Sequence, residues 1–306
     1  MAAALIGLDW GTSSFRAYRI DGAGAVLERK SAPAGIMQIE DGDFERALER
    51  QVGPWLDDAP DRPVIACGMI ASRQGWVEAP YATCPAGIDD LARALLRHAT
   101  GRGRAIHFVP GLSYLGEGGV PDVIRGEETQ ILGAIETGGG ERLLVLPGTH
   151  SKWALAEGGR IVWFATFMTG ELFGVLKRHS ILGRLMQGEE HDPDAFRQGL
   201  AYAGEAGSGL LKRLFSARTL GLFDRLPPAG IASYLSGLLI GTEIAEALTW
   251  TRERAAQGEV TVIGASDLAE RYRQALEERG VAASRAGEDI AAQGLFRIAR
   301  AGGLIR

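Results

Sequence analysis

The stretch LIGLDWGTSSFRAYRI, residues 5–20, predicts how the chain begins to fold. An apolar run interrupted by Asp9 passes through a short polar segment that begins at Gly11 and enters a second run that carries Phe15. This pattern is typical of two strands joined by a tight turn. The turn offers hydroxyl groups and backbone N–H groups without bulky side chains, so it is suited to wrapping a phosphate group.

Asp9 is the unusual residue of this stretch, because it stands at the end of a strand that reads as buried. A buried carboxylate costs free energy unless it is paired or faces a cation. Two interpretations stay open. Asp9 holds Mg²⁺ through water, since Mg²⁺ prefers oxygen ligands, or it accepts hydrogen bonds from N–H groups of an ordinary hairpin turn.

Length and composition indicate a globular protein with two domains. The chain has 306 residues, of which 46% are hydrophobic and 23% charged, and this length accommodates two cores of typical size. The net charge of -5 and a pI near 5.7 argue against nucleic acid or an anionic membrane as the main partner. The only cysteines, Cys67 and Cys84, do not form the framework of a disulfide-rich fold, and we expect both to be reduced.

The N-terminal segment and the lengths of the apolar runs indicate the cellular compartment of the protein. The N-terminus enters a strand without a basic segment, and we find no apolar run that approaches the length needed to cross a bilayer. We therefore expect a cytoplasmic protein without membrane or nucleic-acid partners. A homodimer stays open.

A second stretch, LLVLPGTHSKWALAEGGRIVWFATF at 143–167, repeats the layout of the first. Gly148 and Thr149 take the places of Gly11 and Thr12, and each hairpin continues through a glycine-containing turn into a further strand. A repeated supersecondary unit indicates two related domains. The triple glycine at 138–140 is the clearest break between them, so we predict domains at 1–138 and 139–306.

The remaining pattern is that of an α/β protein. The first half reads as β-β-β-α-β-α-β-α, with helices at 44–55, 88–96 and 127–135 and with Asp43 as the cap of the first. In the second half we predict a helix-rich region at 170–226, a long apolar helix at 232–249, a strand at 260–263 and amphipathic helices at 267–279 and 288–300.

The two Gly-Thr turns together predict a phosphate clamp that holds nucleotide phosphates from both sides. Lys152 can neutralise the charge of a transferring phosphoryl group, whereas His150 either donates to a phosphate oxygen or is a surface residue. The candidate phosphate-binding residues are Gly11, Thr12, Ser13, Gly148, Thr149, His150, Ser151 and Lys152.

The segment VTVIGAS at 260–266 reads as a strand, a turn of small residues and the start of a helix. At Gly264 and Ala265 the near absence of side chains would let a flat purine lie on the backbone, with Ser266 capping the helix. A purely structural turn explains the same residues.

The segment RGEETQ at 125–130 places two carboxylates at the start of a predicted helix. A carboxylate there stabilises the helix N-terminus, or Glu127 is the general base that takes a proton from an attacking alcohol. Arg16, Arg73 and Arg125 are candidates for binding an anionic substrate, because a guanidinium matches a carboxylate. The loop with Ser72, Gln74 and Trp76 can contact a carbohydrate, although Trp76 also suits a core.

These motifs resemble the sugar-kinase branch of the actin-like and hexokinase-like ATPase superfamily. IGLDWGTSSFR is similar to its first phosphate motif, LPGTHSKW to its second and VIGASDLAERY to its adenosine motif. More narrowly, CGMIASRQGWVEAPYATCPAG, DVIRGEETQILGA and FMTGELFGVLKRHSILGR resemble the 2-dehydro-3-deoxygalactonokinase family.

The resemblance implies two actin-like (ribonuclease H-like) domains, each a mixed five-stranded sheet with helices, separated by an active-site cleft. It implies ATP and Mg²⁺ as cofactors, a small sugar acid as substrate, and phosphorylation of the terminal hydroxyl of 2-dehydro-3-deoxy-D-galactonate. Glu127 takes the role of the base, and Asp9 that of the residue that holds Mg²⁺. The superfamily usually has aspartate at the position of Glu127, which leaves Glu128 and Asp122 as alternatives.

The second hairpin also departs from the superfamily pattern, since Pro147 stands where an acidic residue is usual. Two other functions stay open at this point. The protein could phosphorylate another keto-deoxy sugar acid, such as the gluconate epimer, or hydrolyse polyphosphate or guanosine phosphates like other members of the superfamily. A non-catalytic sugar-responsive regulator or a chaperone-like ATPase would need a further domain, for which the two lobes leave no room.

Overall fold

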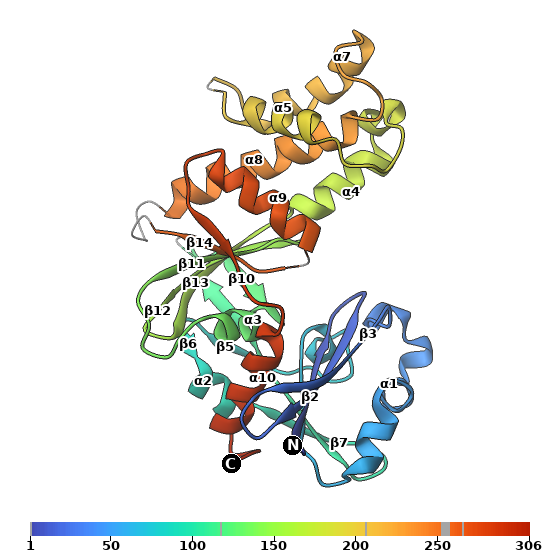
Figure 1. Cartoon of the computed structure of the whole chain (residues 1–306), viewed down its shortest axis with the longest axis vertical. Helices are drawn as coiled ribbons and strands as arrows, with labels where there is room; N and C mark the ends of the chain where they lie inside the picture. The colour runs from blue at the N-terminus through green and yellow to red at the C-terminus, as the bar shows by residue number, and fades with distance from the viewer. Residues whose placement is uncertain (1, 117, 206, 252–257, 265) are drawn as a thin grey trace. The chain divides into compact units, whose positions relative to one another are not determined.

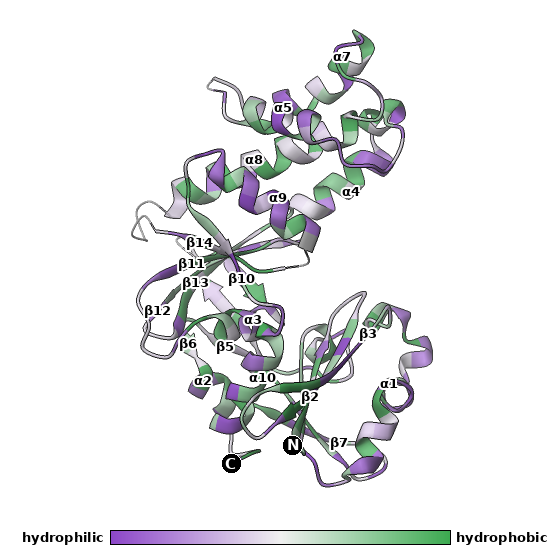
Figure 2. Cartoon of the chain, in the orientation of Figure 1, coloured by the Kyte–Doolittle hydropathy of each residue, from purple (hydrophilic) through white to green (hydrophobic). Residues whose placement is uncertain are grey.

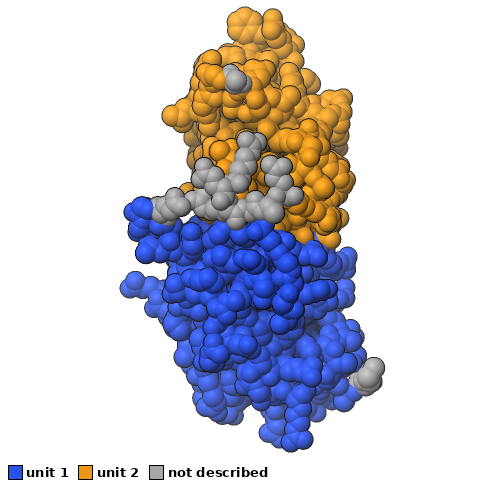
Figure 3. Space-filling view, turned by 90° about the vertical axis from the view of Figure 1, so that its left-hand side faces the viewer, with its two compact units in different colours: residues 1–142, 154–164, 286–306 blue, residues 143–153, 165–285 orange. Residues whose placement is uncertain are grey.

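The computed structural model describes residues 2–116, 118–205, 207–251, 258–264 and 266–306. The chain forms two compact units, which are coloured separately in Figure 3. Unit 1 consists of residues 1–142, 154–164 and 286–306, and unit 2 of residues 143–153 and 165–285. The end of the chain therefore folds back into the unit in which the chain begins.

The first large sheet lies in unit 1 and has the strand order β3-β2-β1-β4-β8-β7. The opening hairpin is confirmed, with Asp9 opposite Arg16 in the antiparallel pair of β1 and β2, while β4 lies parallel to β1 on its other side. The strands are β1 (Ala3–Trp10), β2 (Phe15–Asp21), β3 (Val26–Ala32), β4 (Val64–Cys67), β7 (Leu96–Ala99) and β8 (Ala105–Phe108).

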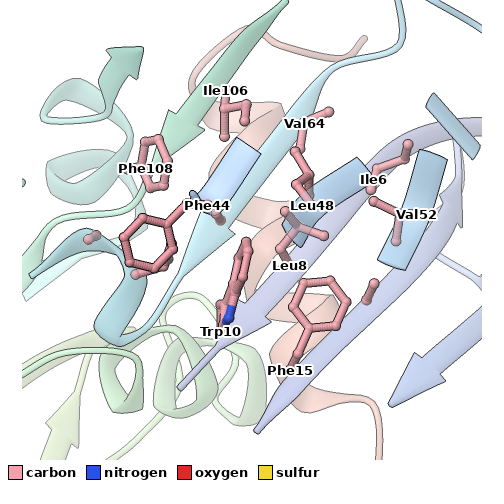
Figure 4. Packing of buried hydrophobic residues seen from close by; sticks show 14 of the residues in the cluster. Ile6, Leu8, Trp10, Phe15, Phe44, Leu48, Val52, Val64, Ile106 and Phe108 are labelled. Atoms are coloured by element: carbon pink, nitrogen blue, oxygen red, sulfur yellow. The ribbon is translucent and has the colours of Figure 1, made fainter. Parts of the chain in front are cut away.

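The core of unit 1 fills the space between this sheet and α1 (Phe44–Asp58). Trp10 meets Phe15 edge to face at 4.9 Å between ring centroids, and Phe44 at 6.1 Å (Figure 4). The Trp10 indole N–H donates to the Ala34 carbonyl at 2.8 Å, which satisfies the polar atom of a fully buried side chain. Asp43 caps α1 as expected, since its carboxylate accepts from the Arg46 backbone N–H.

Further elements of unit 1 were not expected from the sequence. A three-stranded sheet has the order β10-β9-β5, and Leu96, expected in a helix, begins strand β7 because α2 ends at Arg93. The other strands without a counterpart in the prediction are β5 (Tyr81–Thr83), β6 (Ala86–Gly87), β9 (Gly111–Leu115) and β10 (Pro121–Ile124). The predicted helices of unit 1 are confirmed as α2 (Ile88–Arg93), α3 (Glu127–Ala134) and α10 (Ile290–Ala301).

The second large sheet contains the repeated hairpin and has the order β15-β14-β11-β12-β13-β6. The strands β11, β14 and β15 run parallel to one another. The prediction of five strands in each sheet is wrong, because an edge strand, β7 or β6, extends each sheet to six. The strands are β11 (Arg142–Leu146), β12 (Ser151–Glu157), β13 (Arg160–Phe167), β14 (Val260–Val262) and β15 (Ala283–Arg285).

Helices form the rest of unit 2, and Figure 1 labels α4, α5, α7, α8 and α9 among them. The helix α5 packs along α8, where close glycine contacts let the two backbones approach each other. The helices of unit 2 are α4 (Thr169–His179), η4 (Ile181–Leu185), α5 (Pro193–Ala203), α6 (Leu210–Leu214), α7 (Ser216–Leu222), α8 (Ile231–Thr251) and α9 (Ser266–Glu277). The short 3-10 helices η1 (Ile36–Gln38), η2 (Glu40–Gly42) and η3 (Met69–Ala71) belong to unit 1.

The helix α8 corrects the expectation that no apolar run has the length of a membrane span. Its 21 residues are long and apolar enough by length and composition, and Figure 2 marks hydrophobic residues along it. However, 72% of its most apolar window is buried inside the fold. The apolar residues of α8 are therefore those of a core helix, which is hydrophobic on all sides because protein surrounds it.

Candidate functional site

The first turn, between β1 and β2, exposes Thr12 and Ser13. The Gly11 N–H donates to the Ser14 carbonyl at 2.9 Å and so closes the turn. Gly35 supports the turn from behind, because a Cβ atom at this position would lie 2.3 Å from the Thr12 carbonyl oxygen. The two hydroxyl residues that we predicted to contact phosphate thus stand on an exposed turn whose backbone is held in place.

Asp9 is buried directly before this turn, with 7% of its surface exposed. Arg16 Nη1 donates to Asp9 Oδ2 at 3.3 Å, and the arginine side chain is about half exposed. Burial raises the pKa of the Asp9 carboxyl, Arg16 opposes this effect, and the charge of Glu127 adds to it. Asp9 and Glu127 are therefore close enough for their charges to interact.

Two glycines bring three elements together beside Asp9. A Cβ atom at Gly68, directly after β4, would lie 2.7 Å from the Trp10 carbonyl oxygen, and one at Gly126 would lie 3.0 Å from the Gly68 Cα atom. Both glycines also have positive φ angles, +94° and +109°, which side chains rarely tolerate. The end of β1, the end of β4 and the start of α3 meet at this point, which we call the acid junction.

The three acidic residues that could be the base differ in their surroundings. Glu127 is half-buried, and its Oε2 accepts the Arg125 backbone N–H at 2.9 Å. Glu128 is fully buried and accepts from the Gly126 N–H at 2.6 Å and from Thr129 Oγ1 at 3.0 Å. Asp122 lies on β10 and is also half-buried. Of the adjacent pair, only Glu127 is accessible at the acid junction.

Burial raises the pKa of the Glu128 carboxyl to about 7, and the neighbouring charge of Glu127 contributes. Cys67 lies in the same buried region, and burial together with the charges of Asp9 and Glu128 raises the pKa of its thiol well above the usual range. The thiol is therefore protonated at neutral pH, as expected for a packing residue.

The loop after β4 places its polar residues unequally. Ser72 Oγ donates to the Met69 carbonyl at 2.7 Å and accepts the Gln74 N–H at 3.3 Å, so its hydroxyl organises the loop. Arg73 and Gln74 are exposed. Trp76 packs against rings of the core, stacking on Phe44 and meeting His98 and Phe108 edge to face.

Arg125 is 92% buried, the complement of its 8% exposure. Its Nη2 donates to the Ala79 carbonyl at 2.8 Å, and its guanidinium lies 4.3 Å from the centre of the Tyr81 ring. Nε and Nη1 have no hydrogen-bond partner within reach. Because these atoms are also inaccessible, Arg125 fixes the start of α3, and its predicted contact with an anionic substrate would require the loop to open.

The second turn, between β11 and β12, exposes Thr149 and His150. The first turn of α4 packs directly behind it, since a Cβ atom at Gly170 would lie 2.3 Å from the Gly148 carbonyl oxygen. The Glu171 N–H donates to the Thr149 carbonyl at 2.9 Å, and the Glu171 carboxylate is paired with the His150 ring. Thr149 and the backbone of this turn therefore have the exposure that a phosphate site needs.

Two predicted phosphate ligands of the second turn are buried. The Ser151 hydroxyl donates to Glu243 Oε1 at 2.7 Å and is fully buried, so it is turned away from the exposed turn. Lys152 is 5% exposed, and its Nζ donates to the His150 carbonyl at 3.3 Å. The sequence pattern could not separate these two positions from Thr149, because β12 begins within the motif and is buried from its first residue.

The adenosine motif is described in part. Gly264 is exposed after β14, and the preceding Ile263 N–H donates to the Val145 carbonyl at 2.8 Å, which aligns the motif with the strand before the second turn. Ala265 lies outside the described residues. The predicted helix at 267–279 is confirmed as α9, but it begins at Ser266, the residue predicted to precede it as the cap, and ends at Glu277.

The sequence analysis missed residues that hold the turns from behind. Gly35 lies outside the quoted motifs, whereas Gly68 and Gly170 lie within motifs of the family resemblance but had no assigned role. Only their contacts show what they do. Glu243 gave a weak signal, a carboxylate within the apolar run that forms α8.

The residues at the first turn fit a Mg²⁺ ion that is held mainly by the phosphates of a bound nucleotide and by water. Among the residues described here, no group of three or more His, Cys, Asp or Glu residues could hold a metal ion. Mg²⁺ commonly binds through one or two carboxylates together with phosphates and water. Asp9, a buried carboxylate next to an exposed Gly-Thr turn, matches that arrangement.

The fold defines the structural class, which is that of the actin-like ATPase fold. A Clostridium difficile activator of 2-hydroxyisocaproyl-CoA dehydratase with bound ADPNP shares this fold, with a TM-score of 0.52 at 11% identity over 97% of this chain and 95% of its own.

Sequence comparison then gives the family. The chain belongs to the 2-keto-3-deoxy-galactonokinase family, whose model matches residues 9–298. A Rhizobium meliloti protein assigned as a 2-dehydro-3-deoxygalactonokinase is 37% identical, with 96% of each chain covered. The Escherichia coli 2-dehydro-3-deoxygalactonokinase is 34% identical, with 98% of this chain and 99% of its own covered. A crystal structure of a Sinorhizobium meliloti protein assigned to the same activity has a TM-score of 0.87 at 36% identity, with 97% of this chain and 98% of that chain covered.

Proposed function

We propose that this kinase transfers the γ-phosphoryl group of ATP to the terminal hydroxyl of 2-dehydro-3-deoxy-D-galactonate, in the catabolism of D-galactonate. The products are ADP and 2-dehydro-3-deoxy-6-phospho-D-galactonate. The observation that supports this activity most strongly is the acid junction, within a chain that belongs to the family along nearly its whole length. The accessible Glu127 and the buried Asp9 lie there, beside the exposed turn with Thr12 and Ser13 that is suited to binding phosphate.

Glu127 is the base in this proposal. The hydroxyl oxygen of the substrate attacks the γ-phosphorus, the bond to the oxygen shared with the β-phosphate breaks, ADP leaves, and the hydroxyl proton passes to Glu127. The half-exposed carboxylate is suited to this role because one oxygen accepts the Arg125 N–H, which orients the group. Glu128 lacks the exposure for it, since its carboxylate is buried and hydrogen-bonded by its own helix.

Asp9 holds Mg²⁺ through water in this proposal. When bound, the ion would neutralise charge that develops on the phosphate oxygens. Arg16 keeps Asp9 in place through the ion pair at 3.3 Å and lowers the cost of its burial. The backbone and hydroxyl groups of Gly11, Thr12, Ser13, Gly148 and Thr149 bind the phosphates.

His150 and Lys152 keep narrower roles. His150 contacts phosphate either while its ring stays paired with Glu171 or after phosphate has replaced Glu171 as its partner. Lys152 acts through its hydrogen bond to the His150 carbonyl. The base of the nucleotide lies on Gly264, with Ala265 and Ser266 as predicted neighbours.

The substrate's carboxylate and hydroxyl groups meet the loop after β4. Arg73 and Gln74 are its exposed polar residues and are therefore the direct contacts. Arg16 combines its ion pair to Asp9 with an exposed guanidinium edge. Ser72 and Trp76 shape the loop through their contacts with Met69 and the core, and Arg125 fixes the adjacent start of α3.

The wider setting is also a proposal. The two domains, predicted from the sequence at 1–138 and 139–306, act as lobes that close over the ligands, with residues 154–164 and 286–306 belonging to the first lobe as they do to unit 1. Closure matters because water in an open site would compete as acceptor. The protein works in the cytoplasm without membrane or nucleic-acid partners. A homodimer stays a prediction, and exposed apolar residues such as Leu211 and Phe223 on or beside α6 and α7 are consistent with a contact between copies.

The test is ADP release by the purified protein with ATP and Mg²⁺, with the galactonate-derived acid, its gluconate epimer or no sugar acid. Strong preference for the galacto acid is the expected result. Comparable rates with both epimers would broaden the substrate to keto-deoxy sugar acids. Phosphate release from polyphosphate or guanosine phosphates, without stimulation by sugar acid, would overturn the proposal in favour of a phosphatase.

A further inference from the structure

Glu243 is the most extensively bonded buried carboxylate whose contacts the structure describes outside the acid junction. It is 2% exposed and lies on α8, among residues that are mostly apolar. A lone buried carboxylate in such surroundings is costly unless it receives several hydrogen bonds. Its retention in an apolar helix therefore needs a reason beyond packing.

Four side chains donate to this carboxylate. The Ser151 hydroxyl and the Trp153 indole N–H reach Oε1 at 2.7 and 2.8 Å, and the Tyr272 hydroxyl reaches Oε2 at 2.6 Å. A fourth bond comes from Thr169, the first residue of α4. Burial nevertheless raises the pKa of the Glu243 carboxyl, because the bonds offset the loss of hydration only in part.

The donors belong to the elements that carry the proposed nucleotide site in unit 2. Ser151 and Trp153 begin β12 directly after the turn at Gly148–His150. Thr169 precedes Gly170, whose backbone contacts Gly148. Tyr272 lies on α9, the helix that begins at the adenosine motif. One carboxylate on α8 therefore joins the second phosphate turn, the helix behind it and the helix of the adenosine motif.

We propose that Glu243 is a positioning residue that holds the second phosphate turn and α9 in register for nucleotide binding. It acts through Ser151, Thr169 and Tyr272 and does not itself touch the nucleotide. The inference rests on the proposed function only in taking ATP as the phosphoryl donor bound at the second turn. It explains why Ser151, buried and turned away from the exposed turn, still belongs to the motif.

The test compares Glu243→Leu with Glu243→Gln. Leucine leaves the four donors without an acceptor. Glutamine keeps one side-chain oxygen that accepts from Ser151 and Trp153, and its NH₂ group can donate to the Tyr272 hydroxyl oxygen. ADP binding is measured by calorimetry well below the melting temperature, and KM for ATP, KM for the sugar acid and kcat are measured beside it. We expect Glu243→Leu to weaken ADP binding and to raise KM for ATP by up to about 10²-fold, with little change in KM for the sugar acid. Glu243→Gln should restore most of the affinity.

Tyr234→Phe is the matched control, because it also removes a partly buried hydrogen bond of unit 2, that between the Tyr234 and Ser216 hydroxyl groups at 2.7 Å. It should lower the melting temperature without changing ADP binding. If Glu243→Leu does not fold, Ser151→Ala and Tyr272→Phe each remove one donor and should each weaken ADP binding.

Normal ADP binding and normal KM for ATP in folded Glu243→Leu, or in both single-donor variants, would overturn the inference and leave Glu243 a stabilising residue only. A wild-type protein that binds ADP but releases none in response to the sugar acid would count against the proposed function. The calorimetric comparison would still decide the role of Glu243.

Discussion

The two Gly-Thr turns have similar sequences but are held by opposite means. The first follows a buried carboxylate, Asp9, which is balanced by the half-exposed Arg16. The second follows Pro147, and its carboxylate, Glu243, lies behind the turn and is balanced only by neutral donors. The first turn thus has a buried acid directly before it, whereas the second has a buried acid behind it that accepts hydrogen bonds from the surrounding elements. Under the proposed function, the first turn serves metal and proton chemistry and the second serves nucleotide binding.

Glu127→Gln tests the chemical side of this comparison and should have the largest effect. Removing the base should lower kcat by about 10²–10⁴-fold, while the amide oxygen still accepts the Arg125 N–H and preserves the fold. Steady-state kinetics and a thermal melt measure both properties. Near-normal turnover would exclude Glu127 as the base and direct attention to Asp122.

Asp9→Asn should impair turnover and shift the Mg²⁺ dependence of the rate, because a neutral amide is a weaker partner for the ion. The melting temperature without ATP should change little or rise, since the buried charge is removed. A Mg²⁺ titration of the rate is the measurement. An unchanged titration curve would contradict a metal role for the first turn.

Gly35→Ala and Gly170→Ala compare the two turns with matched changes. In each variant the new Cβ atom would lie 2.3 Å from a carbonyl oxygen of a turn, that of Thr12 or of Gly148. Displacement by about 1 Å can reduce kcat/KM by up to about 10²-fold. We expect Gly35→Ala to lower kcat more and Gly170→Ala to raise KM for ATP more. Gly22→Ala, which meets nothing within 4 Å, is the control.

Glu128→Gln should change the pH dependence of stability. The pKa of Glu128 is about 7 in the folded protein and lower in the unfolded chain, so the folded state holds its proton more tightly. The contribution of Glu128 to the free energy of unfolding is therefore complete below about pH 4, and it is lost as the pH rises to about 7. Against wild type, the variant should gain up to about 3 kcal/mol in free energy of unfolding between pH 4 and 8. Denaturant unfolding at several pH values measures this, and parallel curves would contradict it.

Arg16→Ala should have the smallest effect on stability. An ion pair with one half-exposed partner contributes about 0–1 kcal/mol, so the free energy of unfolding should fall by no more than this amount. If Arg16 also contacts the sugar acid, KM for the acid should rise while KM for ATP stays constant. Equal changes in both constants would instead indicate that Arg16 acts through Asp9.

The sequence determined the parts of this protein that depend on local patterns. The hairpins of the two Gly-Thr stretches, the cap at Asp43 and the helix at Glu127 follow from alternation, turn residues and capping preference, and the motifs were specific enough to indicate the family. It could not give strands β5, β6, β7, β9 and β10, because short strands form only when a neighbouring strand offers its hydrogen bonds. The strand at Leu96 is an example, since its apolar spacing also fits a helix.

Only the tertiary structure decided which motif residues face outward and which are scaffold. Ser151 and Thr149 are neighbours in one motif, yet one hydroxyl is bonded to Glu243, 92 positions away, and the other is exposed. Glu127 and Glu128 differ in the same manner, as do Gln74 and Trp76. Residue type is local, whereas burial and the partner of a polar group depend on elements that are distant in the chain, so no local pattern can specify them.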